Sequence, residues 1–167
     1  VFKVNNQKAG IINYDLPYNT GFGFLTLNSI TSGIENTATG SFALYANTSG
    51  AHNTANGYAS LFLNTTGSGN TANGYNALYS NTLGGENIAI GASALRSNVA
   101  GSNGVAIGYY SQFYANNTVT SWDNTNTSVG YQSLRGSTTP ANNTGTENTA
   151  IGRDALLTNS TGAFNTA

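Results

Sequence analysis

The sequence predicts an all-β fold, a parallel β-solenoid (β-roll) of about eight coils of roughly seventeen residues each. Three observations predict it: a regular glycine spacing, aligned columns of like residues, and a short strand-like segment before each glycine. The first glycine of the repeat recurs at a spacing of seventeen and then twice at twenty-two: Gly23, Gly40, Gly57, Gly74, Gly91, Gly108, Gly130 and Gly152. We interpret these as turn glycines, because glycine adopts backbone angles that other residues resist.

Residues at fixed distances from the first glycine are alike from one repeat to the next. A Thr or β-branched residue stands three positions before it: Thr20, Thr37, Thr54, Thr71, Ile88, Val105, Thr127 and Thr149. A leucine stands four positions after it, with Gln112 as the one departure: Leu27, Leu44, Leu61, Leu78, Leu95, Leu134 and Leu156. Such columns are expected when each side chain packs on its copy in the next coil.

Each coil is expected to contain two strands and two turns. Segments such as "NTAIG" before the first glycine are short, partly β-branched and bounded by turn residues, which indicates a strand. In "YNALYSN", Tyr75, Ala77 and Tyr79 alternate with Asn76, Leu78 and Ser80, which favours a second strand, with one helical turn in "ALYSN" as the alternative. A second glycine, ten residues after the first, marks the second turn: Gly33, Gly50, Gly67, Gly84, Gly101 and Gly162.

Residues 1–18 do not follow the period, so we divide the chain into a cap or connector (1–18) and the solenoid (19–167). "VFKV" and "AGIINY" predict a small hairpin around Asn5 and Asn6. This hairpin would cover the open edge of the first coil or join the rod to an upstream part. The chain begins with Val1 and stops inside a ninth repeat, so we expect a segment of something longer.

Two repeats are five residues longer than the rest, and enlarged turn loops are predicted in about 112–126 and 135–146. Both insertions fall near the second turn, so the loops should project from one corner of adjacent coils. Aromatic rings beside short polar side chains suit a carbohydrate or protein receptor. The candidate receptor-binding residues are Phe113, Tyr114, Trp122, Asp123, Asn124 and Asn142. Alternatively, Trp122 folds back onto the rod or a neighbouring chain.

Large aromatic residues form further columns, which a thin coil cannot enclose. Tyr58 and Tyr75 follow the first glycine directly, as do Tyr109 and Tyr131, while Tyr45, Phe62 and Tyr79 form a second column. Exposed apolar stripes of this size favour self-association. We therefore expect a homotrimer packed through Tyr45, Tyr58, Phe62, Tyr75 and Tyr79, or else a single solenoid with aromatic ladders on its surface.

Composition argues against several classes of protein. Only 7% of residues are charged, against about 25% in ordinary domains, and the net charge is −1 with five Lys plus Arg, so nucleic acid is not an expected partner. No apolar run approaches the length of a membrane span, so membrane insertion is not expected. There is no cysteine and no calcium-binding Asp repeat, and no metal or cofactor is predicted. The 38% apolar residues favour a packed interior over disorder.

The single histidine gives little support to an enzyme. His52 shares a turn column with Glu35, Glu86 and Glu147, and we interpret that column as solvated. Glu35 and His52 should lie one coil apart, within reach of a charged hydrogen bond if His52 is protonated. A Ser-His-acid triad needs three converging groups, and the sequence gives no sign of one. N-glycosylation sequons are interpreted as chance occurrences in this composition: Asn47, Asn64, Asn116, Asn126, Asn142 and Asn159.

The repeats "NIAIG" (Asn87 to Gly91), "GVAIG" (Gly104 to Gly108) and "NTAIG" (Asn148 to Gly152) resemble the head repeats of trimeric autotransporter adhesins. In that family these segments are the inner strands of a parallel β-roll wound as a trimer. The fuller pattern "NTA-x-G-Y-x-AL-x-x-NTTGS" is similar to repeat tracts of bacteriophage tail fibres. The adhesin repeat is typically shorter, about fourteen residues, so its handedness and packing do not transfer directly.

The resemblance and the repeat together predict a non-enzymatic rod. The expected role is a rigid trimeric fibre or adhesin segment that displays loops for attachment to a cell-surface glycan or protein receptor. It implies an extracellular place, on a cell surface or a phage-like particle. The alternative is a monomeric solenoid that binds ice or glycan through a flat Thr/Asn face, although Ile88 and Val105 interrupt the Thr row.

Overall fold

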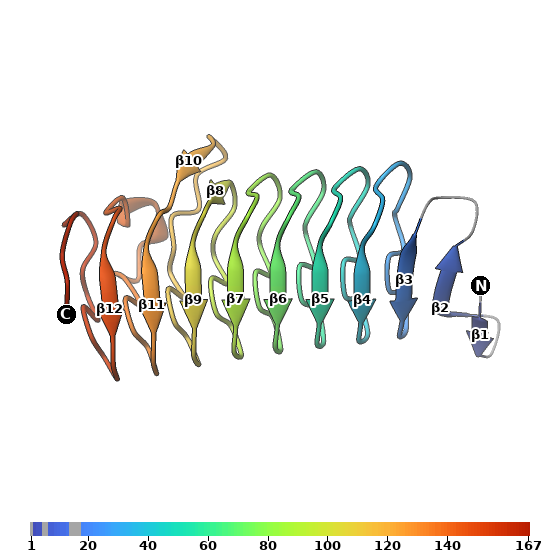
Figure 1. Cartoon of the computed structure of the whole chain (residues 1–167), viewed down its shortest axis with the longest axis horizontal. Helices are drawn as coiled ribbons and strands as arrows, with labels where there is room; N and C mark the ends of the chain where they lie inside the picture. The colour runs from blue at the N-terminus through green and yellow to red at the C-terminus, as the bar shows by residue number, and fades with distance from the viewer. Residues whose placement is uncertain (1, 5–6, 14–17) are drawn as a thin grey trace.

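The chain folds as an all-β solenoid, which confirms the predicted fold class (Figure 1). The computed structural model describes residues 2–4, 7–13 and 18–167. One long sheet contains, in this order, β1 (Phe2–Val4), β2 (Gln7–Asn13), β3 (Asn19–Phe22), β4 (Thr37–Thr39), β5 (Thr54–Asn56), β6 (Thr71–Asn73), β7 (Ile88–Ile90), β9 (Val105–Ile107), β11 (Thr127–Val129) and β12 (Thr149–Ile151). A separate pair is formed by β8 (Gly101–Ser102) and β10 (Trp122–Asp123), and a 3₁₀ turn, η1, spans Pro140–Asn142.

From β3 to β12 the sheet is parallel, and each strand pairs with its equivalent in the next repeat. Thr54 pairs with Thr71, seventeen residues further on, and Thr127 pairs with Thr149 across one of the longer repeats. The middle residue of each strand points inward, as Ala55 does with 1% exposure, while its neighbours Thr54 and Asn56 face outward. One repeat is therefore one coil, and the longer repeats hold their extra residues in loops.

The second predicted strand is wrong, and so is the helical turn. In the segment after each first glycine, every second residue is left-handed; Asn76 and Leu78 have φ of 55° and 51°, whereas a strand needs negative φ. This winding turns two consecutive side chains, Ala77 and Leu78, into the interior, which a strand would send to opposite faces. A left-handed residue costs roughly 1–2 kcal/mol, and full burial of leucine, worth roughly 1.5–3 kcal/mol, offsets it.

The first glycines are required both by their angles and by the close stacking of the coils. Their φ values lie between 126° and 147°. A Cβ atom placed on Gly57 would lie 2.6 Å from the carbonyl oxygen of Gly74 in the next coil. No other residue type fits between coils stacked this closely.

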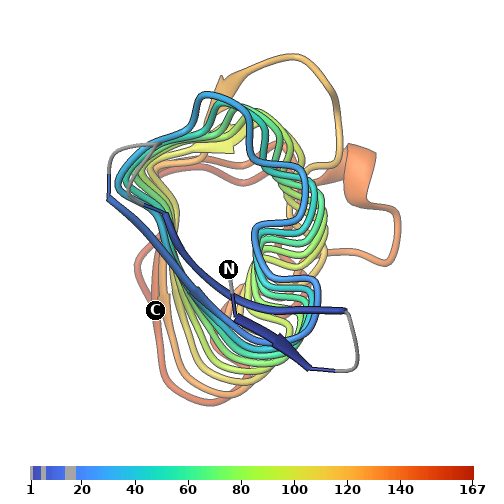
Figure 2. The same cartoon turned by 90° about the vertical axis from the view of Figure 1, so that its right-hand side faces the viewer.

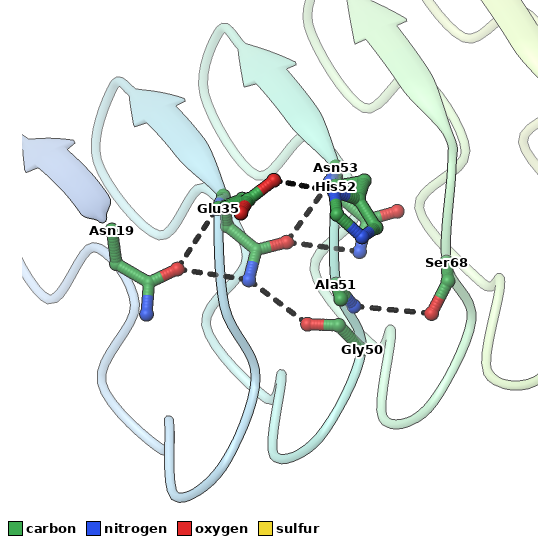
Figure 3. A network of polar contacts seen from close by, with 8 residues as sticks. Asn19, Glu35, Gly50, Ala51, His52, Asn53 and Ser68 are labelled. Atoms are coloured by element: carbon green, nitrogen blue, oxygen red, sulfur yellow. Dashed lines mark hydrogen bonds and ion pairs between the residues drawn. The ribbon is translucent and has the colours of Figure 1, made fainter. Parts of the chain in front are cut away.

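Two ladders of buried asparagines run along the interior beside the leucine column. The first contains fully or nearly fully buried Asn19, Asn36, Asn53, Asn70 and Asn87, and the second contains fully buried Asn47, Asn64, Asn81 and Asn98. In the first, the Nδ2 of Asn53 donates to Oδ1 of Asn36 at 3.1 Å and to the carbonyl oxygen of Gly67 at 2.9 Å; Figure 3 shows the start of this ladder. These side chains supply donors that the buried turn carbonyls need. The sequons at Asn47 and Asn64 are therefore buried structural positions.

The N-terminal strands cover one edge of the parallel sheet. β1 pairs with β2 antiparallel, as the hairpin prediction requires, and the expected turn at Asn5 and Asn6 lies outside the described residues. β2 then pairs antiparallel with β3, so it occupies the edge that the first coil would otherwise leave open.

Candidate functional site

The first enlarged loop is fixed to the coil before it. β10 pairs in parallel with β8, which places Trp122 beside Gly101, the second glycine of the preceding coil. Trp122 therefore takes the position that a second glycine occupies in other coils. A Cβ atom on Gly101 would lie 2.7 Å from the Trp122 ring, so the indole lies directly on the glycine backbone. Trp122 is half-buried, and its Nε1 has no hydrogen-bond partner among the described residues. Trp122 folds back onto the rod, as the second of our two alternatives proposed.

Asn124 is fully buried, so this candidate cannot contact a receptor. Gly104 stands at a position of the first asparagine ladder, so the ladder lacks a side chain there. Asn124 occupies that space, and a Cβ atom placed on Gly104 would lie 2.4 Å from its Nδ2. Its Nδ2 donates to Oε1 of Gln112 at 3.0 Å, and its Oδ1 accepts from Nδ2 of Asn126 at 2.7 Å. Asn124, which belongs to the enlarged loop, therefore supplies the side chain that the first ladder lacks at Gly104.

Gln112 explains the single departure from the leucine column. Its Nε2 donates to the carbonyl oxygen of Val105 at 2.8 Å and to Oγ of Ser128 at 3.0 Å. Ser128 also lies 2.5 Å, Oγ to Oγ, from buried Ser111. The interior of this coil is therefore a connected polar network, and Gln112 is its centre.

The remaining candidates do not form one receptor patch. Tyr114, Trp122 and Asn124 surround a cavity of about 20 Å³, enough for about one water molecule. Phe113 packs edge-on against Tyr114 with ring centroids 4.6 Å apart. Asp123 is exposed and accepts from Nδ2 of Asn103 at 3.0 Å, while Asn142 is exposed on η1. The two loops meet at this cavity, where Nδ2 of Asn143 in the second loop donates to the carbonyl oxygen of Tyr114 in the first, and both extend outward from the rod (Figure 2).

Aromatic columns line the side of the coil opposite the strands, which Figure 2 shows as indented. We call this side the aromatic face; it consists of the residues one, two and five positions after each first glycine. The rings of Tyr45 and Phe62 stack with centroids 5.1 Å apart, and so do those of Phe62 and Tyr79. Tyr58 and Tyr75 stack at 5.5 Å in the parallel column. Tyr75 is 56% exposed, so these predicted packing residues lie on the surface of the single chain.

A groove runs between the two columns, and we call it the aromatic groove. Its volume is about 290 Å³. It is lined by Phe42, Tyr58, Ala59, Phe62, Tyr75, Asn76, Tyr79 and Arg96. The groove was not predicted, although Ala59 and Asn76, two positions after Gly57 and Gly74, are the signal in the sequence for a gap between aromatic columns.

A second apolar surface lies on the outer side of the parallel sheet, which we call the sheet face. On β4 to β6 its residues are Thr and Asn, but from β7 to β12 they are mainly aliphatic: Ile88, Ile90, Val105, Ile107, Val129 and Ile151. Ile151 is 62% exposed and Ile88 is 39% exposed. This face was not predicted, because Ile88 and Val105 interrupt a row of Thr and the second outward column, which contains Ile90, Ile107 and Ile151, is polar from β4 to β6.

His52 and Glu35 form a surface pair. Nδ1 of His52 lies 3.0 Å from the Glu35 carboxylate, one coil away as expected, and the two side chains are 60% and 48% exposed. Figure 3 shows the pair above the asparagine ladder. An exposed pair of this kind contributes at most about 1 kcal/mol. We therefore interpret the His52–Glu35 pair as part of the solvent-exposed turn column.

Comparison with protein-family models, with curated proteins and with solved structures finds no match for this chain. Within the described residues, no helix is long and apolar enough to cross a membrane.

Proposed function

We propose that this chain is a non-enzymatic structural segment of an extracellular fibre or adhesin, which assembles as a homotrimer and displays its loops for attachment. The aliphatic half of the sheet face is the observation on which the proposal rests. A flat strip with Ile88, Ile90 and Ile151 exposed is unusual on a soluble monomer and typical of an interface between copies. β1 and β12 lie at opposite ends of the solenoid, so each further coil would lengthen the rod (Figure 1).

We place the proposed interface on the sheet face and not on the aromatic columns. The rings of Tyr58 and Tyr75 already stack on one another, and the aromatic face is indented by a groove. The sheet face is regular and presents outward side chains at the constant spacing of parallel strands. The resemblance to adhesin head repeats supports the same choice, because the equivalent strands face the trimer interior in that family.

Two sets of substitutions test this assignment with residues that the repeat itself uses. Ile88→Thr with Ile90→Asn gives β7 the outward residues of β6, Thr71 and Asn73. We expect sedimentation to show that this double variant dissociates to single chains.

The matched control removes aromatic rings from the opposite side. Tyr58→Ser with Tyr75→Ala introduces the residues found at the same position of neighbouring coils, Ser41 and Ala92. This variant should remain a trimer. If the control dissociated and the sheet-face variant remained a trimer, the interface would lie on the aromatic columns and not on the sheet face.

The second candidate is a monomeric solenoid that binds ice. It is favoured by the outward row of Thr37, Thr54 and Thr71 on three successive strands, about 4.8 Å apart. An assay of ice-crystal growth distinguishes it, since a fibre segment should not slow growth and an ice-binding solenoid should.

A further inference from the structure

We propose that the aromatic groove is a binding site for an acidic sugar, a pyranose ring bearing a carboxylate, and that Arg96 binds the carboxylate. The groove lies on the side of the coil opposite the sheet face, so the proposal does not depend on trimer formation. None of the residues that line the groove belongs to either enlarged loop.

The groove has a defined length, because the residue two positions after each first glycine determines whether the space between the two columns is open or filled. Two positions after the first glycine stand Ala59 and Asn76, which form the floor. In the preceding coil the same position holds Phe42, whose ring meets Tyr58 at 5.7 Å and Phe62 at 6.2 Å and so joins the two columns. The site therefore spans about two coils, with ring walls on both sides.

The equivalent position further along the rod shows what happens without a small residue. Tyr110 occupies it, and its ring stacks on Tyr109 at 4.1 Å and contacts Phe113 at 4.3 Å. Aromatic residues at this position thus fill the space between the columns. Ala59 and Asn76 leave it open.

Arg96 is held in place at the far end with its donors free. Its guanidinium carbon lies 5.2 Å from the centroid of the Tyr79 ring and 5.6 Å from that of Phe113, so it replaces a ring in the column. Arg96 makes no side-chain hydrogen bond or ion pair within the described part of the chain. A guanidinium oriented by stacking loses little freedom when it binds a carboxylate through two parallel hydrogen bonds.

The charge of the aromatic face favours an anionic ligand. All three arginines of the chain lie in its columns: Arg96, Arg135 and Arg153. Among the acidic residues that the structure describes, only Asp154 belongs to this face, and it pairs with Arg153 at 3.3 Å. Positive charge beside a partly enclosed apolar site attracts anions and repels cations.

The free polar groups favour a sugar over a purely aromatic acid. The hydroxyls of Tyr58, Tyr75 and Tyr79 make no hydrogen bond to any residue that the structure describes, and Asn76 lines the same groove. Ring walls with polar tips suit a ligand that has both C–H surfaces and several hydroxyl groups. A volume of about 290 Å³ is at the lower end for small-molecule sites, which suits a single sugar unit.

Ligand-observed NMR titration of the full chain with glucuronic acid, glucose and benzoate tests the proposal. Glucuronic acid should bind, and glucose should bind at least about tenfold more weakly because it lacks the charge-assisted contact. Binding of glucuronic acid should weaken as salt is raised. No binding of glucuronic acid, equal binding of glucose, or tighter binding of benzoate would overturn the assignment.

Two variants locate the site. Arg96→Gln should reduce glucuronic acid binding at least about tenfold, while Arg153→Gln, on the same face but outside the groove, should leave it unchanged. Ala59→Phe should abolish binding without unfolding the chain, because Phe42 stands at the equivalent left-handed position. Unchanged binding in both Arg96→Gln and Ala59→Phe would remove the site from the groove.

Discussion

The coils of β4 to β6 and the coils of β9 and β11 distribute polar and apolar groups differently. In the coils of β4, β5 and β6 the interior contains leucine and alanine, and the sheet face is Thr and Asn. In the coil of β9 and β11 the interior contains Gln112, Ser111 and Ser128, and the sheet face is aliphatic. The backbone pairing is the same in both sets of coils.

This difference shows which features of the repeat every coil shares and which can vary. The hydrogen bonds between coils and the stacking of glycines tolerate either interior, provided that every buried polar group finds a partner. In the coils of β4 to β6, leucine, alanine and paired asparagines lie beneath a polar outer face. The coils of β9 and β11 have a more polar interior beneath an aliphatic outer face, and the β7 coil combines the buried Ala89, Ala94 and Leu95 with exposed Ile88 and Ile90. From β7 onward apolar surface is therefore left outside, and a second copy would cover it.

The largest effect is expected from breaking an asparagine ladder in the regular coils. Asn70→Ala removes the acceptor of the backbone N–H and the Nδ2 of Asn87, both at 3.0 Å, and a donor to Gly84. We expect the free energy of unfolding to fall by about 3 kcal/mol, because buried groups lose their partners. Urea unfolding measures it, with Asn73→Ala on the sheet face as the control at about 0.5 kcal/mol or less. An equal loss of unfolding free energy in the two variants would show that the ladder does not stabilise the chain.

A smaller loss is expected when the irregular interior is made regular. Gln112→Leu restores the leucine of the other coils but removes the Gln112 hydrogen bonds to the carbonyl oxygen of Val105 and to Oγ of Ser128, and it leaves the buried Nδ2 of Asn124 without its acceptor. We expect a loss of about 1–3 kcal/mol despite the gain in apolar surface. Thermal unfolding provides the measurement. A more stable variant would mean that the polar network is not needed in the loop-bearing coil.

The smallest effect should be a gain. The second ladder ends at Asn98, whose buried Oδ1 lacks a partner within the described residues, and Ala115 stands where the next asparagine would be. Ala115→Asn should extend the ladder and stabilise the chain by about 1 kcal/mol. The unfolding midpoint in urea should rise. A fall would indicate that the loop has moved this position out of register.

The sequence predicted the coil because its columns repeat the same residue at a constant spacing. The strand before the first glycine, the column of leucines that includes Leu78, and the β1–β2 pairing all followed from local patterns. The second strand failed because alternating left-handed residues give the same period of two as a strand. Single-sequence patterns do not distinguish the two backbones when leucine, and not glycine, occupies the left-handed position.

The features of the candidate site were harder to predict because they depend on neighbouring coils. Asparagine is usually exposed, so the spacing of Asn53 and Asn70 did not indicate a buried ladder. The position of Trp122 depends on its pairing with Gly101 across an insertion. The groove depends on which coil has a small residue between two aromatic columns, as Ala59 does.

Light scattering across a dilution series gives the solution mass of the chain and decides whether it is a trimer. We expect about three times 17.2 kDa, stable on dilution, because other copies cover the aliphatic half of the sheet face. A mass of 17.2 kDa at all concentrations would contradict it. The exposed isoleucines would then belong to a single solenoid, and the fibre proposal would be wrong.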